Sequence, residues 1–301
     1  MKSHEYMKIQ MTKSQKSNVN KIKRKIKQLR NINPQLQIES IDIRNKQINL
    51  IQDGVLIAGT KQRVAELFAK RMIQEEKIKG NNIHTLIYVG TYNGYGAVAT
   101  AFAAHRLNLK CIVFLTAVPI GNNDKTLAQD IIKSRQINTL LALKTNIILC
   151  NSYGLCKRKS YKLLDNDSGY YAIPMGINDD RNIMSTMMSE QMRKAMKGTV
   201  LQTVKKPRIW LVAGSGGIMM SINKSMDCIL FVYLTGGGRY YERVIEYINN
   251  HDNIFIVNRD VQLPKTNNSY YNTVKNYDDQ IIPYVEEFGQ DGDFIWNVGS
   301  E

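Results

Sequence analysis

Residues 85–106 read TLIYVGTYNGYGAVATAFAAHR, an apolar run followed by a glycine-rich turn and an alanine-rich run. The first five residues are apolar or β-branched throughout, which is typical of a strand buried on both faces. The alanines from residue 97 onward give a small-faced helix suited to close packing on a sheet. This stretch therefore predicts one strand–turn–helix unit of an α/β protein.

The same alternation continues along the chain. Further strands are expected in the apolar runs at residues 110–115, 147–150, 209–213, 229–234 and 254–257. Further helices are expected at about residues 61–78, 126–142, 185–197, 239–250 and 279–288. Strands that alternate with helices in this way predict an α/β architecture with mainly parallel sheets.

The composition narrows the class of protein. A chain of 301 residues with 43% apolar and 22% charged residues can bury the core of one large domain or two modest ones. No stretch approaches the roughly 20 uninterrupted apolar residues that span a bilayer, and the first residues lack the apolar segment of a secretory signal. We therefore expect a cytoplasmic protein that does not act at a membrane.

The cysteines and histidines show no metal-ligand spacing. No two of the four cysteines are spaced CxxC, and the four histidines are scattered along the chain. The cysteines are Cys111, Cys150, Cys156 and Cys228. We expect them to be buried reduced thiols, and we expect no metal site.

The net charge of +15 is unevenly spread along the chain. Residues 1–33 hold eight Lys and two Arg against a single acidic residue, Glu5, so they carry +9. Such an arm attracts phosphate polymers by counterion release. Two interpretations stay open: residues 1–35 form a solvated, partly disordered extension, or residues 1–33 bind nucleic acid.

One glycine-rich segment places a lysine at the start of a helix. Residues 59–63 read GTKQR, so a glycine turn opens directly into a helical pattern. At that position Lys61 lies at the positive end of the helix dipole, which disfavours its charged form. A neutral amine is a nucleophile, although exposed lysines are also common at helix starts.

Two other glycine-rich segments follow apolar strands. Residues 90–96 (GTYNGYG) and 213–217 (AGSGG) both form strand-to-helix turns, where backbone N–H groups can bind an anion. In the second segment the Ser215 hydroxyl adds another donor. Neither segment matches the GxGxxG or P-loop pattern, and tight packing is the alternative explanation for each.

Taken together in this order, the segments resemble the tryptophan-synthase-β-like, or fold-type II, family of pyridoxal-phosphate enzymes. The nearest branch is the 1-aminocyclopropane-1-carboxylate deaminase and D-cysteine desulfhydrase group. AGTKQR at residues 58–63 is similar to the GGNKxR-type segment, with Lys61 in the place of the Schiff-base lysine. TYNGYGAVA at residues 91–99 is similar to SNxxxxVA, with Asn93 matching the asparagine that lies against the cofactor ring.

Later segments agree in part and depart in part. YAIPMG at residues 171–176 is similar to the family's YxIPxG. The EGxxLDPVYTGK segment of the deaminase branch is represented only by NYDDQ at residues 276–280, with Gln280 where that branch has lysine. The closing IHTGG becomes IWNVG at residues 295–299, so an amide, Asn297, replaces the hydroxyl near the pyridine nitrogen. An amide does not keep that nitrogen protonated as a carboxylate does, which weakens the electron sink.

The resemblance implies two α/β domains with mainly parallel twisted sheets, pyridoxal 5'-phosphate as cofactor, and a homodimer. Residues 36–80 with 166–301 would form the larger, phosphate-binding domain, and residues 81–165 the smaller one. Lys61 would form the Schiff base and then act as the base at the substrate's α-carbon. The cofactor-binding residues would be Asn93, Gly214, Ser215, Gly216, Gly217 and Asn297. The substrate-binding residues would be Thr91, Tyr92, Gly94 and Tyr95.

The function implied by the resemblance is lyase or deaminase chemistry on an amino acid or an amine-bearing small molecule. The alternative is a non-catalytic relative that keeps the fold, or a nucleic-acid-associated protein targeted by its basic arm. An enzyme that acts on a nucleotide-linked amine would combine the two.

Overall fold

The computed structural model describes most of the chain. The described residues are 11–92, 94–116, 131, 134–177, 183–235, 239–259, 261–264, 270–271, 273 and 277–299. The chain divides into two compact units. Unit 1 contains residues 1–32 and 65–177, and unit 2 contains residues 33–64 and 178–301.

Unit 1 is built on a four-stranded parallel sheet with the strand order β5-β4-β3-β6. The strands are β3 (Thr85–Thr91), β4 (Lys110–Thr116), β5 (Asn146–Cys150) and β6 (Tyr170–Ile173). In the register, Thr85 of β3 lies opposite both Lys110 and Tyr170. The carboxyl ends of all four strands therefore lie at one edge of this sheet.

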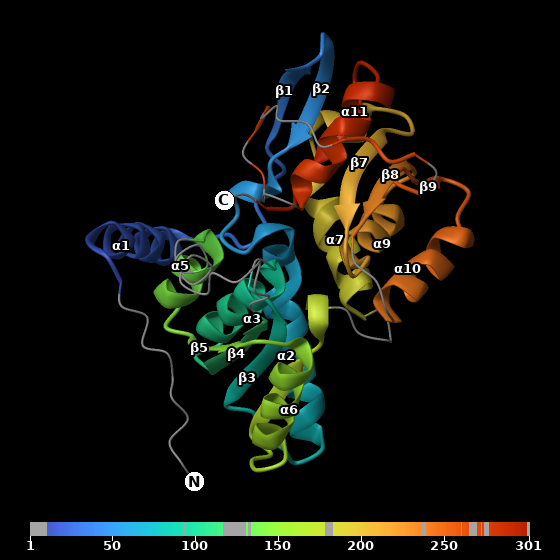
Figure 1. The fold of residues 1–301 in the computed structure, drawn as a ribbon. Coiled ribbons are helices and arrows are strands. Elements are labelled where there is room, and N and C mark those ends of the chain that lie inside the picture. The colour runs from blue at the N-terminus through green and yellow to red at the C-terminus, as the bar shows by residue number, and fades with distance from the viewer. Residues whose placement is uncertain are drawn as a thin grey trace. The chain divides into compact units, whose positions relative to one another are not determined.

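Some helices of unit 1 pack on its sheet, and others pack on neighbouring helices (Figure 1). The helices are α1 (Lys13–Gln28), α2 (Gln62–Ile78), α3 (Tyr95–Arg106), α5 (Arg135–Ala142) and α6 (Tyr153–Leu164), with a short 3-10 turn, η3 (Met175–Ile177). Helix α3 packs on β3 and β4, and α6 contacts all four strands. The alanine-rich α3 is buried along almost its whole length, as its small side chains predict.

Part of the basic N-terminal segment is helical and packs on unit 1, rather than being a wholly solvated extension. Residues 13–28 form α1, which begins at a capping box between Thr12 and Gln15. Val19 and Ile26 are buried where α1 packs against α5. These apolar side chains recur at helical spacing among the lysines, and their burial stabilises the helix. Residues 1–10 lie outside the described residues.

Unit 2 is built on a six-stranded sheet with the order β1-β2-β10-β7-β8-β9. The strands are β1 (Ile38–Ile43), β2 (Lys46–Ile51), β7 (Arg208–Ala213), β8 (Ile229–Leu234), β9 (Ile254–Ile256) and β10 (Phe294–Trp296). The first two form an antiparallel hairpin whose turn residues, Arg44 and Asn45, have φ angles of 48° and 65°. Every other pairing in this sheet is parallel.

Unit 2 also contains several helices and 3-10 turns. They are α7 (Ile183–Met196), α8 (Val200–Thr203), α9 (Gly217–Ser225), α10 (Arg239–Asn249) and α11 (Ile282–Phe288), with 3-10 turns η1 (Asp53–Val55), η2 (Gly59–Lys61) and η4 (Asp278–Ile281). Helix α9 contacts β7 and β8, and α7 packs on α9. The core is centred on Trp210, which stacks on Phe231 at 4.3 Å and donates a hydrogen bond to Asp293 at 2.7 Å.

All six strands expected from the apolar runs are present. The strands that the sequence did not reveal are short or carry polar residues, namely β1, β2, β6 and β10. The units also divide at other residues than expected. Residues from Ala65 onward group with unit 1, and β6 belongs to unit 1 because it pairs with β3.

Two further expectations concern the cysteines and membrane-spanning helices. All four cysteines are buried free thiols, as expected from the sequence. Across the part of the chain that the structure describes, no helix is both long and apolar enough to cross a membrane.

Candidate functional site

Lys61 ends the η2 turn at the start of α2, as the glycine-to-helix pattern predicted. The turn begins at Gly59, whose φ of 56° is one that glycine adopts without steric cost. Burial lowers the pKa of the Lys61 amine to about 8, and the nearby carboxylate of Asp278 partly opposes this shift. At pH 7 about one Lys61 amine in ten is therefore neutral, against about one in three thousand for an ordinary lysine.

Asp278 is the acidic partner of Lys61. It begins η4 and is only 2% exposed. Burial raises the pKa of Asp278 well above its usual range, against the opposing effects of the Gly299 and Val298 backbone and of Lys61. Neither carboxylate oxygen has a side-chain donor at hydrogen-bond distance. Burial thus favours the neutral form of both groups.

The residue before Lys61 is fixed from the C-terminal segment. The Thr60 N–H donates to the Val298 carbonyl at 3.1 Å, and the Trp296 indole N–H donates to the Thr60 hydroxyl at 3.2 Å. Thr60 and Trp296 are each 1% exposed. Trp296, which stands where the resembling family has histidine, therefore positions the lysine turn.

The residues after Lys61 are fixed from the N-terminal part of unit 2. The Gln62 side-chain oxygen accepts a hydrogen bond from the Ile57 N–H at 2.9 Å. The Arg63 guanidinium binds both oxygens of Asp53, at 3.1 and 2.5 Å. Arg63 and Asp53 are each 1% exposed, so their ion pair is shielded from water. Lys61 is thus held between two sets of buried hydrogen bonds.

The loop at residues 214–217 connects β7 to α9. Gly216 is the N-terminal cap of α9 and has a φ of 75°, and no side chain caps the helix there. A Cβ on Gly216 would lie 2.5 Å from a Val244 methyl, so this position accepts glycine for two separate reasons. The first N–H groups of a helix have no partner within the helix, which makes its N-terminus an anion site.

Tyr277 connects this loop to the lysine. Its hydroxyl hydrogen-bonds the Gly214 backbone N–H and the Thr235 side chain, and burial raises its pKa. The next residue along the chain is Asp278, the partner of Lys61. The short segment at residues 277–278 therefore hydrogen-bonds the glycine loop through Tyr277 and acts electrostatically on Lys61 through Asp278, and all of these groups belong to unit 2.

Asn297 follows β10 and is completely buried. Its backbone N–H donates to the Ile51 carbonyl at 3.1 Å. A Cβ on Gly54 would lie 2.8 Å from the Asn297 side-chain nitrogen, so Gly54 leaves the space that this amide fills. The role of Asn297 beside a pyridine nitrogen stays a prediction.

The expected substrate-binding turn belongs to unit 1. Thr91 ends β3 and is exposed, Tyr92 is half-buried, Gly94 caps α3, and Tyr95 is its buried first residue. Asn93 lies outside the described residues.

The other two glycines of this turn serve packing. A Cβ on Gly90 or Gly96 would lie 2.5 or 2.0 Å from the Tyr88 ring or hydroxyl. Tyr88 in turn accepts a hydrogen bond from the Gly176 N–H at 3.0 Å. Close packing, the alternative explanation for a glycine-rich turn, therefore accounts for these two positions.

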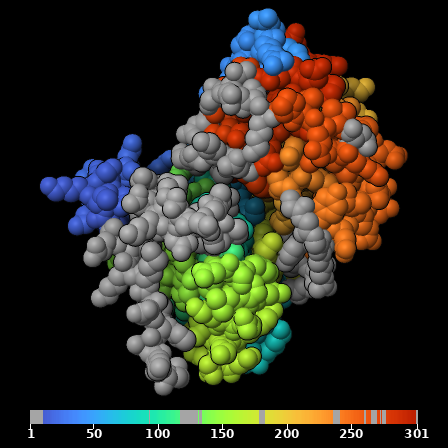
Figure 2. All heavy atoms as spheres, viewed as in Figure 1, coloured from blue at the N-terminus to red at the C-terminus, as the bar shows by residue number. Residues whose placement is uncertain are grey.

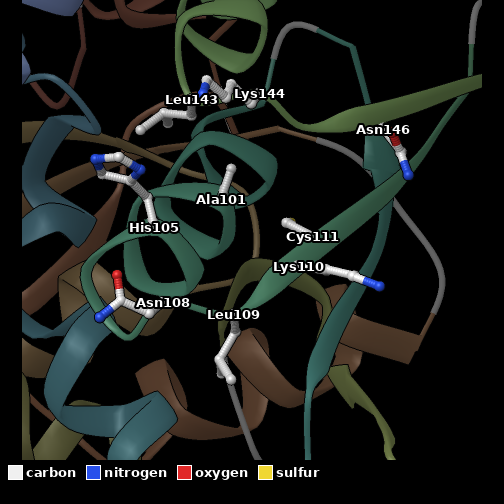
Figure 3. Close-up of a pocket in the computed structure, with 9 residues that line it drawn as sticks. All are labelled: Ala101, His105, Asn108, Leu109, Lys110, Cys111, Leu143, Lys144 and Asn146. Carbon is white, nitrogen blue, oxygen red and sulfur yellow. The ribbon is translucent and has the colours of Figure 1, made fainter.

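A surface depression of about 390 Å³ lies at the other end of the unit 1 strands (Figure 3). Ala101 and Cys111 line it together with the basic side chains of His105, Lys110 and Lys144. Lys110 begins β4, whereas the predicted site residue Thr91 ends β3. The depression therefore contains none of the predicted site residues.

The sequence reasoning missed Asp278 and Tyr277 as parts of the site. It treated residues 276–280 only as the remnant of a longer segment. A tyrosine followed by two acids at the start of an apolar helix was the available signal, because acids favour helix N-termini. The Asp53–Arg63 pair could have been suspected from two charges enclosing the apolar stretch at residues 55–58.

Comparison with known proteins identifies the fold. No protein-family model and no curated protein sequence matches the chain. Among solved structures, an ACC deaminase homologue superposes with a TM-score of 0.60 at 13% identity, over 89% of this chain and 90% of its own. Diaminopropionate ammonia lyase of Escherichia coli gives 0.58 at 11% identity, over 95% and 87%. Serine racemase of Dictyostelium discoideum gives 0.53 at 10%, over 94% and 97%.

These similarities confirm the expected fold class. The chain has the tryptophan-synthase-β-like α/β fold of fold-type II pyridoxal-phosphate enzymes. Lyases, deaminases and racemases share this fold, and at 10–13% identity the similarity concerns the fold alone.

Proposed function

We propose that the chain is a pyridoxal-phosphate-dependent lyase or deaminase that acts on an amino acid or an amine-bearing small molecule through Lys61. The observation that carries this proposal is the half-buried Lys61, whose amine has its pKa lowered by desolvation to about 8 and is coupled electrostatically to the buried Asp278. Perturbed pKa values of this kind cluster at functional sites. The fold supports the cofactor class, since the similar solved structures include enzymes named for such chemistry.

The residues of unit 2 fit this cofactor. The N–H groups and hydroxyl of residues 214–217 suit its phosphate, with Gly214 sharing its N–H with Tyr277. The Lys61 amine suits its aldehyde. Asp278 offers buried carboxylate oxygens that lack side-chain donors. When bound, pyridoxal phosphate would supply an aldehyde and an electron-withdrawing ring that stabilises negative charge at the substrate's α-carbon.

Lys61 has two tasks in this proposal. Its neutral fraction provides the nucleophile for the aldehyde at neutral pH. As a free amine, Lys61 would also be the base for the proton at the substrate's α-carbon, and a pKa of about 8 suits a base that works near neutral pH. The hydrogen bonds to Thr60 and Gln62 keep the lysine turn in place during both steps.

Asp278 changes the prediction of which side chain would keep the pyridine nitrogen of the cofactor protonated. From the sequence, an amide at Asn297 was the only candidate partner and implied a weak electron sink. A carboxyl group in the same unit is a better partner, because an acidic side chain next to the ring nitrogen keeps it protonated. We therefore assign this task to Asp278, with Asn297 as a neighbouring structural amide.

Thr91 and its neighbours in unit 1 remain the proposed substrate-carboxylate site. Gly94 caps α3 without a side-chain hydrogen bond, which leaves the helix start to the backbone. The N-terminus of a helix of this length favours a carboxylate.

The test is to add pyridoxal phosphate to the purified chain, reduce with borohydride, and map the modified lysine by mass spectrometry. We expect a single label on Lys61, and no label on the Lys61→Ala variant. Lys46→Arg is the matched control, because the Lys46 amine is also partly buried in unit 2 but donates to the Glu286 carbonyl at 2.8 Å. That variant should label as well as the original chain.

Two outcomes contradict the proposal. A label scattered over surface lysines, or equal labelling of the Lys61→Ala variant, would leave a non-catalytic relative of the fold as the better description. If Lys61 is labelled, release of ammonia from a panel of amino acids then identifies the reaction.

A further inference from the structure

Helix α6 presents two tyrosines and several cations on its outer side. Between Tyr153 and Leu164 the helix has four basic residues and no acidic one. Tyr153 is 36% exposed and Tyr161 51% exposed. The exposed basic residues of this helix are Lys157, Arg158 and Lys162. Figure 2 shows this segment, in lime, on the face turned toward the viewer.

The two tyrosines and one lysine form a single stripe. Tyr153, Lys157 and Tyr161 are spaced four residues apart, so they lie on one face of the helix. The Lys157 amine is 5.8 Å from the Tyr153 ring centroid and 5.9 Å from that of Tyr161. The two rings thus border one cation, and each keeps an exposed surface.

The inner side of α6 is already occupied. Cys156 and Ser160 are buried, and Leu155, Leu163 and Leu164 pack against the core cluster of Ile87, Phe114, Cys150 and Cys156. The helix therefore has no apolar stripe left to insert into a lipid surface. The outer stripe is aromatic and cationic rather than aliphatic.

The charge of the whole molecule is concentrated in the same unit. Unit 1 contains 24 Lys and Arg against 8 Asp and Glu, a net charge of +16. Unit 2 contains 17 against 18, a net charge of −1. Helix α1 of unit 1 has no acidic residue at all, and its exposed residues include Lys13, Lys16 and Arg24. Such a field attracts a polyanion from solution.

We propose that the outer face of α6 binds single-stranded nucleic acid. Tyr153 and Tyr161 stack on unpaired bases, while Lys157, Arg158 and Lys162 contact the phosphates between them. Exposed aromatic rings alternating with cations are the common feature of proteins that bind single strands without sequence preference. A duplex keeps its bases stacked inside, so it uses only the cations of this face. The proposal goes beyond the proposed chemistry of Lys61 and does not depend on it.

The test is fluorescence anisotropy of the full chain with a labelled oligothymidylate of about 20 nucleotides, at about 50 mM KCl. We expect binding that the double variant Tyr153→Ala/Tyr161→Ala weakens about tenfold or more, because each stacked base contributes to affinity. The variant Tyr153→Phe/Tyr161→Phe keeps both rings and should bind like the original chain. Tyr241→Ala in α10 is the matched control, since Tyr241 is 40% exposed on a helix of unit 2.

Further measurements separate stacking from charge. Duplex DNA of the same length should bind more weakly, and its affinity should not respond to the tyrosine-to-alanine change. For the single strand, Lys157→Gln/Arg158→Gln should reduce the slope of log affinity against log salt by about 1.4, or 0.7 for each contact. Far-UV circular dichroism confirms that each variant is folded.

Three results would overturn the proposal. The first is no binding of the oligothymidylate at low salt. The second is binding that folded Tyr→Ala protein retains unchanged, which would assign the affinity to charge elsewhere, such as α1. The third is tight binding to phosphatidylserine vesicles with none to the oligonucleotide, which would identify a membrane surface instead.

Discussion

The two units share a parallel α/β construction but place their charges differently. Unit 2, with a net charge of −1, buries several ionisable side chains, among them Asp53, Arg63, Asp278 and Asp293. Unit 1, with a net charge of +16, keeps its charges at the surface, and Glu66 is the only charged side chain among its described residues that is buried. Unit 2 therefore carries buried ionisable groups in its interior, whereas unit 1 carries its excess of positive charge mainly at its surface.

The difference shows where the molecule carries an energetic cost. A buried charge is costly unless a partner and hydrogen bonds compensate for it. Arg63 and Asp53 form a buried ion pair with two hydrogen bonds between them, whereas burial shifts Lys61 and Asp278 toward their neutral forms. An incompletely compensated pair beside a well-compensated one is typical of a functional site on a rigid support.

The largest effect is expected from breaking the compensated pair. Arg63→Met leaves Asp53 buried without its partner, and we expect a loss of about 3–5 kcal/mol in the free energy of unfolding. Urea unfolding followed by tryptophan fluorescence measures this loss for unit 2. Both tryptophans of the chain, Trp210 and Trp296, belong to that unit.

The matched change in unit 1 is Arg106→Met. Arg106 binds Glu66 at 3.0 Å but is 38% exposed. This variant should lose less than about 1 kcal/mol. The double variant Asp53→Asn/Arg63→Met should lose less than Arg63→Met alone, since it leaves no buried charge. Equal losses for Arg63→Met and Arg106→Met would remove the distinction between the two units.

The next effect concerns the glycine loop. Gly216→Ala combines a φ of 75° with a 2.5 Å approach to Val244, so we expect a loss of about 2–3 kcal/mol. In unit 1, Gly80 has a φ of 89° and nothing within 4 Å of the new Cβ. Gly80→Ala should lose only about 1 kcal/mol, and thermal unfolding of both variants checks the difference. A loss for Gly216→Ala no larger than this would mean that Val244 moves aside.

A smaller effect is expected on the pKa of Lys61 when Asp278 is replaced. Asp278 raises the pKa of Lys61, so Asp278→Asn should move it further down, below about 8. The rate at which acetic anhydride labels Lys61, mapped by mass spectrometry against pH, should then reach its half-maximum at a lower pH. Surface lysines in the same sample serve as an internal reference. An upward or absent shift would show that the two groups are not coupled.

The Lys61 shift also affects stability. Because the folded chain binds the Lys61 proton less tightly than the unfolded chain, the charged lysine is destabilising below about pH 8. This cost disappears as the pH rises from about 8 toward 10.5. Lys61→Met should therefore gain more stability over the original chain at pH 7 than at pH 10.

The smallest effect is expected on α1. Partial burial lowers the pKa of Lys25, and the charges of Arg135 and of Lys21, one helical turn away, lower it further. Lys25→Glu should stabilise the chain by about 0.2–0.5 kcal/mol at low ionic strength, and the gain should shrink in high salt. Circular dichroism melts in low and high salt measure both values. Destabilisation by this change would show that the favourable contacts of Lys25 outweigh its repulsion by neighbouring charges.

Most of the fold could be predicted from the sequence because most strands are continuous apolar runs. The runs at β3, β4, β7 and β8 are apolar and bounded by turns, so their periodicity is readable without tertiary information. Strand β1 (IESIDI) mixes polar and apolar residues and is recognisable mainly through its pairing with β2. β10 has only three residues and is fixed by neighbours on both sides.

The site was predictable only in part, for a similar reason. Lys61 and residues 214–217 stand next to local signals, a glycine turn and a helix start. The effect of Asp278 on Lys61 depends on burial and on a contact between residues far apart in the sequence, neither of which a local pattern contains. The helical state of α1 was not predicted because lysines dominate its composition. Only two buried apolar residues, Val19 and Ile26, stabilise the helix, and they are hard to recognise among the lysines.

The parallel pairing of β2 with β10 determines the order in which the two sheets can be completed during synthesis. β2 ends at Ile51 and β10 begins at Phe294, so β2 cannot pair with β10 until more than 240 further residues have been synthesised. At about 5–20 residues per second this wait lasts roughly 12–50 s. During it the β1–β2 hairpin has an uncovered edge, a template for pairing with another nascent chain. Residues 65–177, which are continuous, can meanwhile complete the unit 1 sheet. The unit 1 sheet and the basic helix α6 can therefore fold before β10 completes the surroundings of Lys61 in unit 2.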